Sequence, residues 1–346
     1  MTTWTDFLAE RGARFDAAPA TRLQAFGNDA GLVRTNFVVP LTHFGLIAAT
    51  GEEAAHFLHG QLTNDVEHLG DADARLAGYC SPKGRLLADM LMWKDRHGIM
   101  LELPRELQAG VQKRLQMYLL RAKAKLEDVS AQHAMLGLAG PAVASVLMPW
   151  FPTLPVAVYG KVESEAGTLI RHPNAFETPR YQWIARAETA VAAWPVLTAV
   201  LQAAGAEAWE LAEIESGVPH ITAATQEQFV PQMVNFELIG GVNFRKGCYP
   251  GQEIVARSQY LGKLKRRMLR ASVTSADAVP GTEIFSAADP DQPCGMVVNA
   301  ARTQDGEADC LVEIKMAAAD GEIRLGSAAG PVLAFKPLPY PLTDPA

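Results

Sequence analysis

The feature that most constrains the fold is a stretch from Ala134 to Gly160 that carries no charged side chain. Its length and apolar character would suit a helix that crosses a membrane. Its prolines argue against this, because each would remove a helix hydrogen bond that lipid cannot replace. We therefore expect a buried strand, a short helix and a proline-rich loop. The prolines are Pro141, Pro149, Pro152 and Pro155.

The bulk composition is that of a soluble globular protein. The chain has 346 residues, 49% of them hydrophobic, which is enough for two or three domains. Its net charge of −7 argues against a general polyanion binder, because such affinity comes from lysines and arginines that neutralise phosphates. The N-terminal residues include Asp6 and Glu10 and lack an apolar run of signal-peptide length, so we expect a cytoplasmic protein with no membrane partner.

Hydrophobic periodicity predicts an α+β pattern. Thr50, followed by Glu53 at capping-box spacing, predicts a helix that runs to about Gly60. Two strands before Pro104 and a helix after it are expected next, and a third helix is expected to stop at Gly205. Beyond about Met268, short β-prone runs between Pro-Gly and Asp-Pro turns predict a small barrel or sandwich.

The cysteines are far apart and form no CxxC pair, so neither a disulfide framework nor a self-contained metal site is indicated. Reduced thiols and no bound metal are expected. These cysteines are Cys80, Cys248, Cys294 and Cys310.

The sequence RKGCYPGQE around Cys248 is the strongest candidate for chemistry. Lys246 and Arg257 lie near this cysteine in the sequence, and nearby cations favour a thiolate. Gly247 and Gly251 indicate a tight turn in which the backbone can approach a ligand closely. A buried structural cysteine fits the same residues, and no histidine lies in a motif that marks it as a catalytic base.

Three other segments carry polar side chains at predicted turns. QLTNDV ends the first helix with groups that either cap it or bond a polar heterocycle. YCSPKGRLLAD places Lys83 and Arg85 in a turn that suits an anion, and LAEIESGVPHI places Glu215 before a backbone break. The basic run from Lys263 to Arg270 fits nucleic acid, an acidic ligand tail or a solvated strand.

Taken in order, FLHGQLTNDV, YCSPKGRLLAD, ESGVPHI, FVPQMVNFE and FRKGCYPGQEIVAR resemble the YgfZ-type folate-binding proteins. That family is similar in fold to the glycine-cleavage T-protein, an aminomethyltransferase. The resemblance implies two ferredoxin-like α/β units and a small C-terminal β barrel, arranged in a ring. It divides the chain into an N-terminal segment (1–30), a folate-binding body of two units that may interleave (31–265) and a barrel (266–346).

The resemblance further implies tetrahydrofolate, or a one-carbon derivative of it, as the cofactor. It implies a role in assembly or repair of iron-sulfur enzymes, with client proteins such as a tRNA-modifying radical enzyme as partners. The family's functional cysteine falls on Cys248, and Lys246 and Asp89 are its candidate catalytic companions. In T-proteins the segment that matches Asp89 reads Gly-Gly-x-x-Asp-Asp, and here Arg85 and Ala88 replace a glycine and an aspartate. The implied folate contacts are Asn64, Tyr79, Lys83, Arg85, Glu215, Tyr249, Gln252, Glu253 and Arg257.

Two other functions stay open at this point. One is a glycine-cleavage-type aminomethyltransferase, which the shared fold favours and Ala88 disfavours. The other is a protein that binds tRNA directly through the basic run, against which the net charge counts, so stable nucleic-acid binding is not expected.

Overall fold

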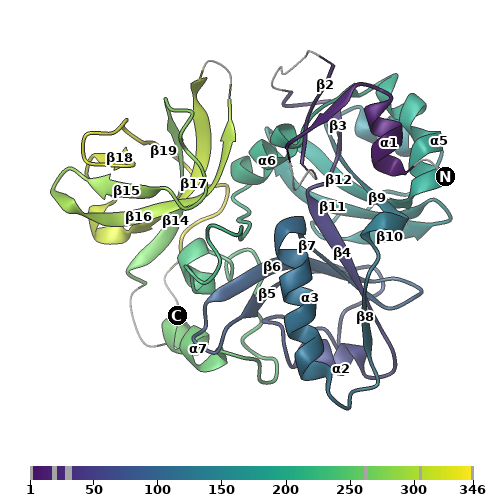
Figure 1. Ribbon diagram of the computed structural model, residues 1–346, viewed down its shortest axis with the longest axis horizontal. Coiled ribbons are helices and arrows are strands. Elements are labelled where there is room, and N and C mark those ends of the chain that lie inside the picture. The colour runs from purple at the N-terminus through teal and green to yellow at the C-terminus, as the bar shows by residue number, and fades with distance from the viewer. Residues whose placement is uncertain (1–2, 18–21, 28–32, 261–263, 304–305, 344–346) are drawn as a thin grey trace. The chain divides into compact units, whose positions relative to one another are not determined.

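A computed structural model describes residues 3–17, 22–27, 33–260, 264–303 and 306–343 of the chain (Figure 1). The chain divides into two compact units that interleave in sequence. Unit 1 consists of Met1–Ala55, His68–Arg75 and Leu91–Ala212, and unit 2 of His56–Glu67, Leu76–Met90 and Glu213–Ala346. None of the described helices is long and apolar enough to cross a membrane.

Unit 1 contains a six-stranded sheet covered by two helices. Figure 1 shows α1 (Trp4–Ala9) and α5 (Ala187–Thr198) side by side over this sheet. The side chain of Thr3 caps α1 by accepting a hydrogen bond from the Asp6 backbone, and the helices bury a core with the sheet that includes Trp183 and Trp194. The strand order is β10 (Lys161–Ser164), β11 (Gly167–Ala175), β12 (Thr178–Arg186), β9 (His133–Ala139), β3 (Phe37–Pro40) and β13 (Gln202–Ala203).

A second layer of unit 1 packs strands against one long helix. β4 (Phe44–Thr50) pairs antiparallel with both β7 (Ile99–Pro104) and β8 (Lys125–Asp128). The helix α3 (Arg105–Leu119) packs against β4 through an apolar face that includes the buried Leu107, Val111 and Leu115. The smaller elements of the unit are β1 (Ala13–Phe15), β2 (Leu23–Phe26), η1 (Ser130–Gln132) and α4 (Val143–Leu147).

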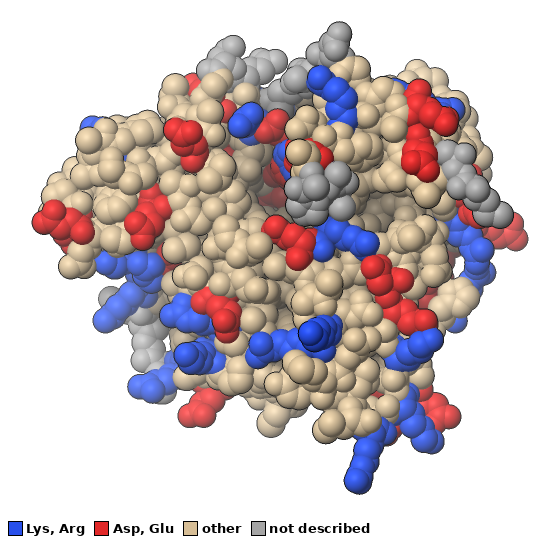
Figure 2. Space-filling view, viewed as in Figure 1, with Lys and Arg blue, Asp and Glu red and all other residues tan. Residues whose placement is uncertain are grey.

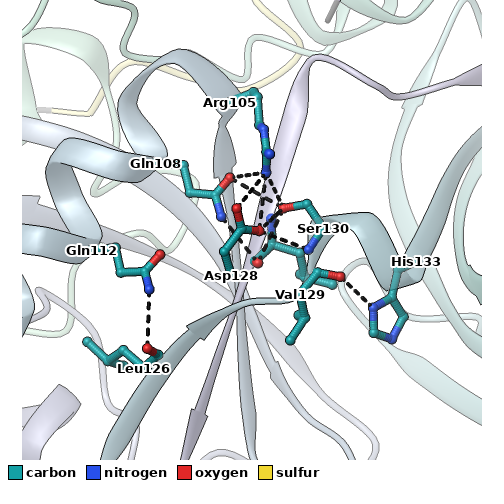
Figure 3. Close-up of polar contacts among 9 residues, drawn as sticks. Arg105, Gln108, Gln112, Leu126, Asp128, Val129, Ser130 and His133 are labelled. Atoms are coloured by element: carbon teal, nitrogen blue, oxygen red, sulfur yellow. Dashed lines mark hydrogen bonds and ion pairs between the residues drawn. The ribbon is translucent and has the colours of Figure 1, made fainter. Parts of the chain in front are cut away.

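A polar network fixes the start of α3 to the end of β8 (Figure 3). The Arg105 guanidinium lies 3.2 Å from an Asp128 carboxylate oxygen, and that oxygen accepts hydrogen bonds from the Ser130 hydroxyl at 2.6 Å and the Ser130 backbone at 2.9 Å. Partial burial opposes the charge of Asp128, but the hydrogen bonds from Ser130 and Gln108 and the charge of Arg105 together outweigh it and lower its pKa to about 2. The network therefore depends on an ionised Asp128.

Unit 2 contains a six-stranded antiparallel sheet and the turns that carry the candidate site. Its core includes Val297, Val312 and Ile314. The sheet order is β18 (Ile323–Leu325), β15 (Glu283–Ser286), β16 (Asp289–Arg302), β17 (Ala308–Lys315), β14 (Arg266–Val273) and β19 (Ala334–Lys336). The remaining elements named below or drawn in Figure 1 are α2 (Ala54–His59), β5 (Ala74–Cys80), β6 (Leu86–Lys94), α6 (Ala206–Glu215), η2 (Pro231–Val234), α7 (Gln252–Tyr260) and η4 (Met316–Ala318).

The mixed α/β architecture agrees with the sequence prediction, and so does the charge-free stretch. It forms β9, the short helix α4 and a loop. Two helix boundaries were wrong. The helix predicted from Thr50 is α2, which begins at Ala54 because Glu53 accepts a hydrogen bond from the Lys123 backbone at 2.6 Å instead of capping a helix. The helix predicted to stop at Gly205 is α5, which ends at Thr198.

All six tryptophans of the chain belong to unit 1. They are Trp4, Trp93, Trp150, Trp183, Trp194 and Trp209.

Candidate functional site

The turn that carries Cys248, from Lys246 to Gly251 and called the cysteine turn below, meets the turn between β5 and β6 in unit 2. The β5–β6 turn is closed by a hydrogen bond from the Gly84 backbone to the Ser81 carbonyl, at 2.8 Å. Gly251 lies against it with a φ of +78°, and a Cβ at Gly251 would lie 2.4 Å from the Ser81 carbonyl oxygen and 2.6 Å from Gly84 Cα. Only glycine fits this approach, so the glycine predicted to admit a ligand instead admits another turn of the same chain.

Cys248 is the accessible thiol of the protein. It is exposed, whereas the other three cysteines are buried. Burial raises the pKa of the Cys80 thiol to about 12, the Cys310 thiol to about 12, and also the pKa of Cys294. At neutral pH these buried thiols are protonated and shielded, so thiol chemistry at the surface of the protein belongs to Cys248.

Lys246 anchors the cysteine turn to the end of α2. Its buried ammonium donates hydrogen bonds to the carbonyl oxygens of His59 and Leu62, the latter at 2.8 Å, and lies 4.9 Å from the centre of the Tyr249 ring. Burial lowers the pKa of Lys246 to about 8, although the nearby carboxylates of Asp65 and Glu67 act in the opposite direction. The predicted catalytic lysine therefore has a defined role in holding the turn.

Asp89 pairs with a histidine that sequence reasoning did not single out. Its Oδ2 lies 2.8 Å from His220 Nδ1, and its Oδ1 accepts a hydrogen bond from the Ile221 backbone at 2.6 Å. Glu213 lies on the other side of the ring, 3.9 Å from Nε2, and Asn299 bonds the His220 backbone twice, at 2.9 Å each. Asp89 is thus one member of a buried carboxylate, imidazole and carboxylate cluster.

Glu215 forms an ion pair within unit 2. Its Oε2 lies 2.8 Å from the Arg270 guanidinium, which also donates to the Glu215 carbonyl at 3.1 Å. The following Gly217 accepts a hydrogen bond at its carbonyl from the Tyr340 hydroxyl at 2.7 Å. A Cβ at Gly217 would lie 2.7 Å from the Tyr340 ring, so the break after Glu215 is held by the C-terminal segment.

Three of the predicted folate contacts are buried in the framework of the site. The Asn64 amide donates both of its hydrogens, to the carbonyls of Leu76 and Gly240 at 2.7 Å each. Tyr79 is buried on β5, and Tyr249 is buried beside Lys246, where burial raises the pKa of its phenol. These buried side chains therefore support the site and do not line its surface.

The other predicted contacts lie nearer the surface. Lys83, Glu253 and Arg257 are exposed, and Gln252 is partly exposed at the first turn of α7. Arg85 donates a hydrogen bond to the Gln228 carbonyl, which directs it away from a simple solvated position. Lys83 and Arg257 are the cations of this group with the most freedom to meet an anion.

The histidines His59 and His220 are the polar residues that the sequence interpretation missed. Both lie beside carboxylates, since His59 Nδ1 is 3.2 Å from Asp65 and His220 Nδ1 is 2.8 Å from Asp89. The six-residue separation of His59 and Asp65 across a helix end was a usable local signal, whereas nothing local connects Asp89 with His220. Within the described ranges, no group of three or more His, Cys, Asp and Glu side chains is arranged to hold a metal ion.

The fold and the paired turns define the class of protein. The chain is similar to the crystal structure of glycine cleavage system aminomethyltransferase T from Bartonella henselae, with a TM-score of 0.79 and 16% sequence identity over 98% of this chain and 97% of that one. At that identity the likeness is one of fold. Residues 8–159 match the GCVT N-terminal domain family. The chain is therefore a mixed α/β protein with the fold of the aminomethyltransferase T proteins.

Within that class the chain belongs to the YgfZ family. It is 31% identical to the tRNA-modifying protein YgfZ of Klebsiella pneumoniae (strain 342), over 89% of this chain and 94% of the relative. It is 32% identical to the tRNA-modifying protein YgfZ of Edwardsiella ictaluri (strain 93-146), over 85% of this chain and 89% of the relative.

Proposed function

We propose that this protein binds tetrahydrofolate and serves as an accessory factor in the assembly or repair of iron-sulfur enzymes. Its effect on tRNA modification is then indirect, through a client enzyme that needs its cluster, and Cys248 is the working thiol. Family membership supports the link to tRNA modification, because the relatives are named tRNA-modifying proteins. The aminomethyltransferase T fold supports a folate site.

One observation carries the proposal: a single exposed cysteine stands on a turn that the structure fixes at two points. Lys246 ties the turn to the end of α2, and Gly251 ties it to the Ser81–Gly84 turn. A structural cysteine needs neither exposure nor such support, since buried thiols serve that purpose elsewhere in this chain. Fixed position and exposure together are what a reactive thiol requires.

Several side chains of unit 2 fit a folate. A carboxylate accepts two parallel hydrogen bonds from an aminopyrimidine edge, and Glu215, whose Oε2 lies 2.8 Å from the Arg270 guanidinium, is the candidate for this contact with the pterin. The exposed Lys83 and Arg257 suit the negatively charged tail of the cofactor. When bound, the folate supplies a carrier for a one-carbon unit. The protein's own residues bind it and hold its orientation.

The finer description of the fold belongs to the same proposal. Two ferredoxin-like units and a C-terminal barrel would carry the folate site, with boundaries at residues 30 and 265. The separate six-stranded sheet that runs from β14 to β19, all after residue 265, supports the C-terminal part of this division.

An aminomethyltransferase activity is less well supported by the site. Such chemistry needs an aspartate near the reacting nitrogen, and here both oxygens of Asp89 are engaged, by His220 and by the Ile221 backbone. Ala88 replaces the other aspartate of the T-protein segment. Turnover with an aminomethyl-lipoyl carrier protein and tetrahydrofolate would restore this alternative.

Direct tRNA binding through the basic run is also less well supported. Arg266, Arg267 and Arg270 pair with the carboxylates of Glu313, Glu237 and Glu215, so their charges are compensated within the fold. Lys263 lies outside the described residues. On the face drawn in Figure 2, Lys and Arg side chains lie among Asp and Glu side chains over much of the surface.

The test replaces Cys248 with alanine and measures tetrahydrofolate binding by calorimetry, together with iron-sulfur enzyme activity in cells that lack the native gene. We expect binding to persist and the rescue of enzyme activity to fail. Cys294→Ala, which removes a buried thiol of the C-terminal sheet, is the control and should rescue. Full rescue by Cys248→Ala would make Cys248 structural and overturn the proposal, and absence of folate binding by the unaltered protein would overturn its cofactor.

A further inference from the structure

The end of α2 and the cysteine turn meet at His59, within unit 2. Lys246 donates to the His59 carbonyl, which brings the backbone of the turn against the last residue of the helix. A Cβ built on Gly247 would lie 3.5 Å from His59 Nε2. The imidazole therefore borders the turn at the residue that directly precedes Cys248.

The other ring nitrogen of His59 faces carboxylates. Nδ1 lies 3.2 Å from Asp65 Oδ1 and 4.0 Å from Glu67 Oε2. The Asp65 contact does not meet hydrogen-bond geometry, but its negative charge favours a proton on Nδ1, which leaves Nε2 with a lone pair. Nε2 is the nitrogen on the side of the cysteine turn, so the ring presents its basic atom there.

Burial and charge around His59 suit proton transfer. The His59 side chain is 14% exposed and that of Asp65 is 16% exposed, which weakens screening by water. The charged groups beside the ring are Asp65 and Glu67 from the segment after α2, while the Lys246 ammonium of the cysteine turn binds the His59 backbone carbonyl. An imidazolium formed at His59 would therefore lie beside two carboxylates.

From this geometry we infer that His59, oriented by Asp65, accepts the proton of the Cys248 thiol. In this step the S–H bond of Cys248 breaks, an N–H bond forms at His59 Nε2, and the electron pair stays on sulfur. The product is a thiolate beside an imidazolium, the form of cysteine that adds to soft electrophiles. This inference rests on the proposed function only in taking Cys248 as the working thiol.

The contacts of His59 with Asp65 and with the cysteine turn would also fit a purely structural role, in which His59 only stabilises the end of α2. The two roles differ in one measurable quantity, the pH at which Cys248 becomes reactive. A structural histidine leaves that pH unchanged, whereas a proton acceptor lowers it. Because the other cysteines are buried, a small alkylating reagent reads Cys248 selectively, and Cys248→Ala supplies the blank.

The experiment follows the rate of alkylation by iodoacetamide between about pH 5 and pH 10, a range that spans the ordinary pKa values of histidine and cysteine. For His59→Gln we expect the inflection of the rate profile to rise by about one pH unit or more relative to the unaltered protein. Asp65→Asn should raise it by a smaller amount. An unchanged inflection in His59→Gln overturns the inference.

A neighbouring histidine provides the matched control. His56 lies on the same helix, pairs with Glu67 at 2.8 Å and has a side chain that is 82% exposed. His56→Gln removes an imidazole near the same carboxylate, and its profile should superimpose on that of the unaltered protein. A shift as large as that of His59→Gln would assign the effect to general charge and overturn the specific role of His59.

Two further measurements separate the possible failures. If His59→Gln does not fold, as judged by circular dichroism, the His59 imidazole is titrated by NMR in the unaltered protein and in Cys248→Ser. A different His59 pKa in the two proteins supports the pair, and the same pKa overturns it. Calorimetry with tetrahydrofolate is run on His59→Gln and the unaltered protein, and lack of binding by both would refute the cofactor while leaving the alkylation result intact.

Discussion

The contact between Gly251 and the Ser81–Gly84 turn predicts a large cost for one methyl group. In Gly251→Ala the new Cβ would lie 2.4 Å from the Ser81 carbonyl oxygen, at a φ of +78°. The left-handed backbone costs an alanine about 1–2 kcal/mol. Forcing backbone atoms apart adds about 1–3 kcal/mol, so we expect a loss of about 2–5 kcal/mol in the free energy of unfolding.

Gly326→Ala is the matched control, because Gly326 has a φ of +75° and no atom within 4 Å of its Cβ position. It carries the backbone cost of about 1–2 kcal/mol without the collision. Urea denaturation followed by far-UV circular dichroism measures both variants. If Gly251→Ala is no less stable than Gly326→Ala, the close approach of the two turns does not hold, and the fixed position of Cys248 loses one of its two supports.

Three further outcomes follow from the charges. The pKa of Asp128 is lowered from 3.8 to about 2, so its contribution to stability is complete above about pH 3.8 and is lost as the pH falls through about 2. Thermal unfolding measured at a series of acidic pH values should show this loss for the unaltered protein and not for Asp128→Asn. Arg267→Met should cost about 3–5 kcal/mol in urea, because it leaves Glu237 buried without its partner, and a cost indistinguishable from that of Lys125→Met at an exposed pair would contradict this. Glu215→Gln should weaken tetrahydrofolate binding by about tenfold in calorimetry, and unchanged affinity would remove Glu215 from the folate site.

Local features of the fold could be predicted from the sequence because their causes are local. Prolines excluded a membrane helix between Ala134 and Gly160, and the structure has a strand, a short helix and a loop there. The helix predicted after Pro104 is α3, in which the buried Leu107, Val111 and Leu115 share one face. Helix ends were less predictable, since the Glu53 side chain bonds the distant Lys123 backbone.

The arrangement of the site could not be predicted, because its determining contacts join distant parts of the chain. Gly251 was expected to give a ligand room, and the group it accommodates is the turn of Ser81 and Gly84. The arginines of the basic run looked like a surface for anions until the structure paired them with carboxylates far away in sequence. Charge in a sequence shows which ions are present and says nothing of which opposite charges fold against them.

The tryptophans and the exposed cysteine lie in different units, so each unit can be followed by its own fluorescence signal. Every tryptophan lies in unit 1, and the exposed thiol lies in unit 2. Intrinsic emission therefore reports one unit, and a fluorescent dye attached to Cys248 reports the other. A single denaturation series recorded at two wavelengths would show whether the interleaved units melt together or in sequence, with no engineered label site.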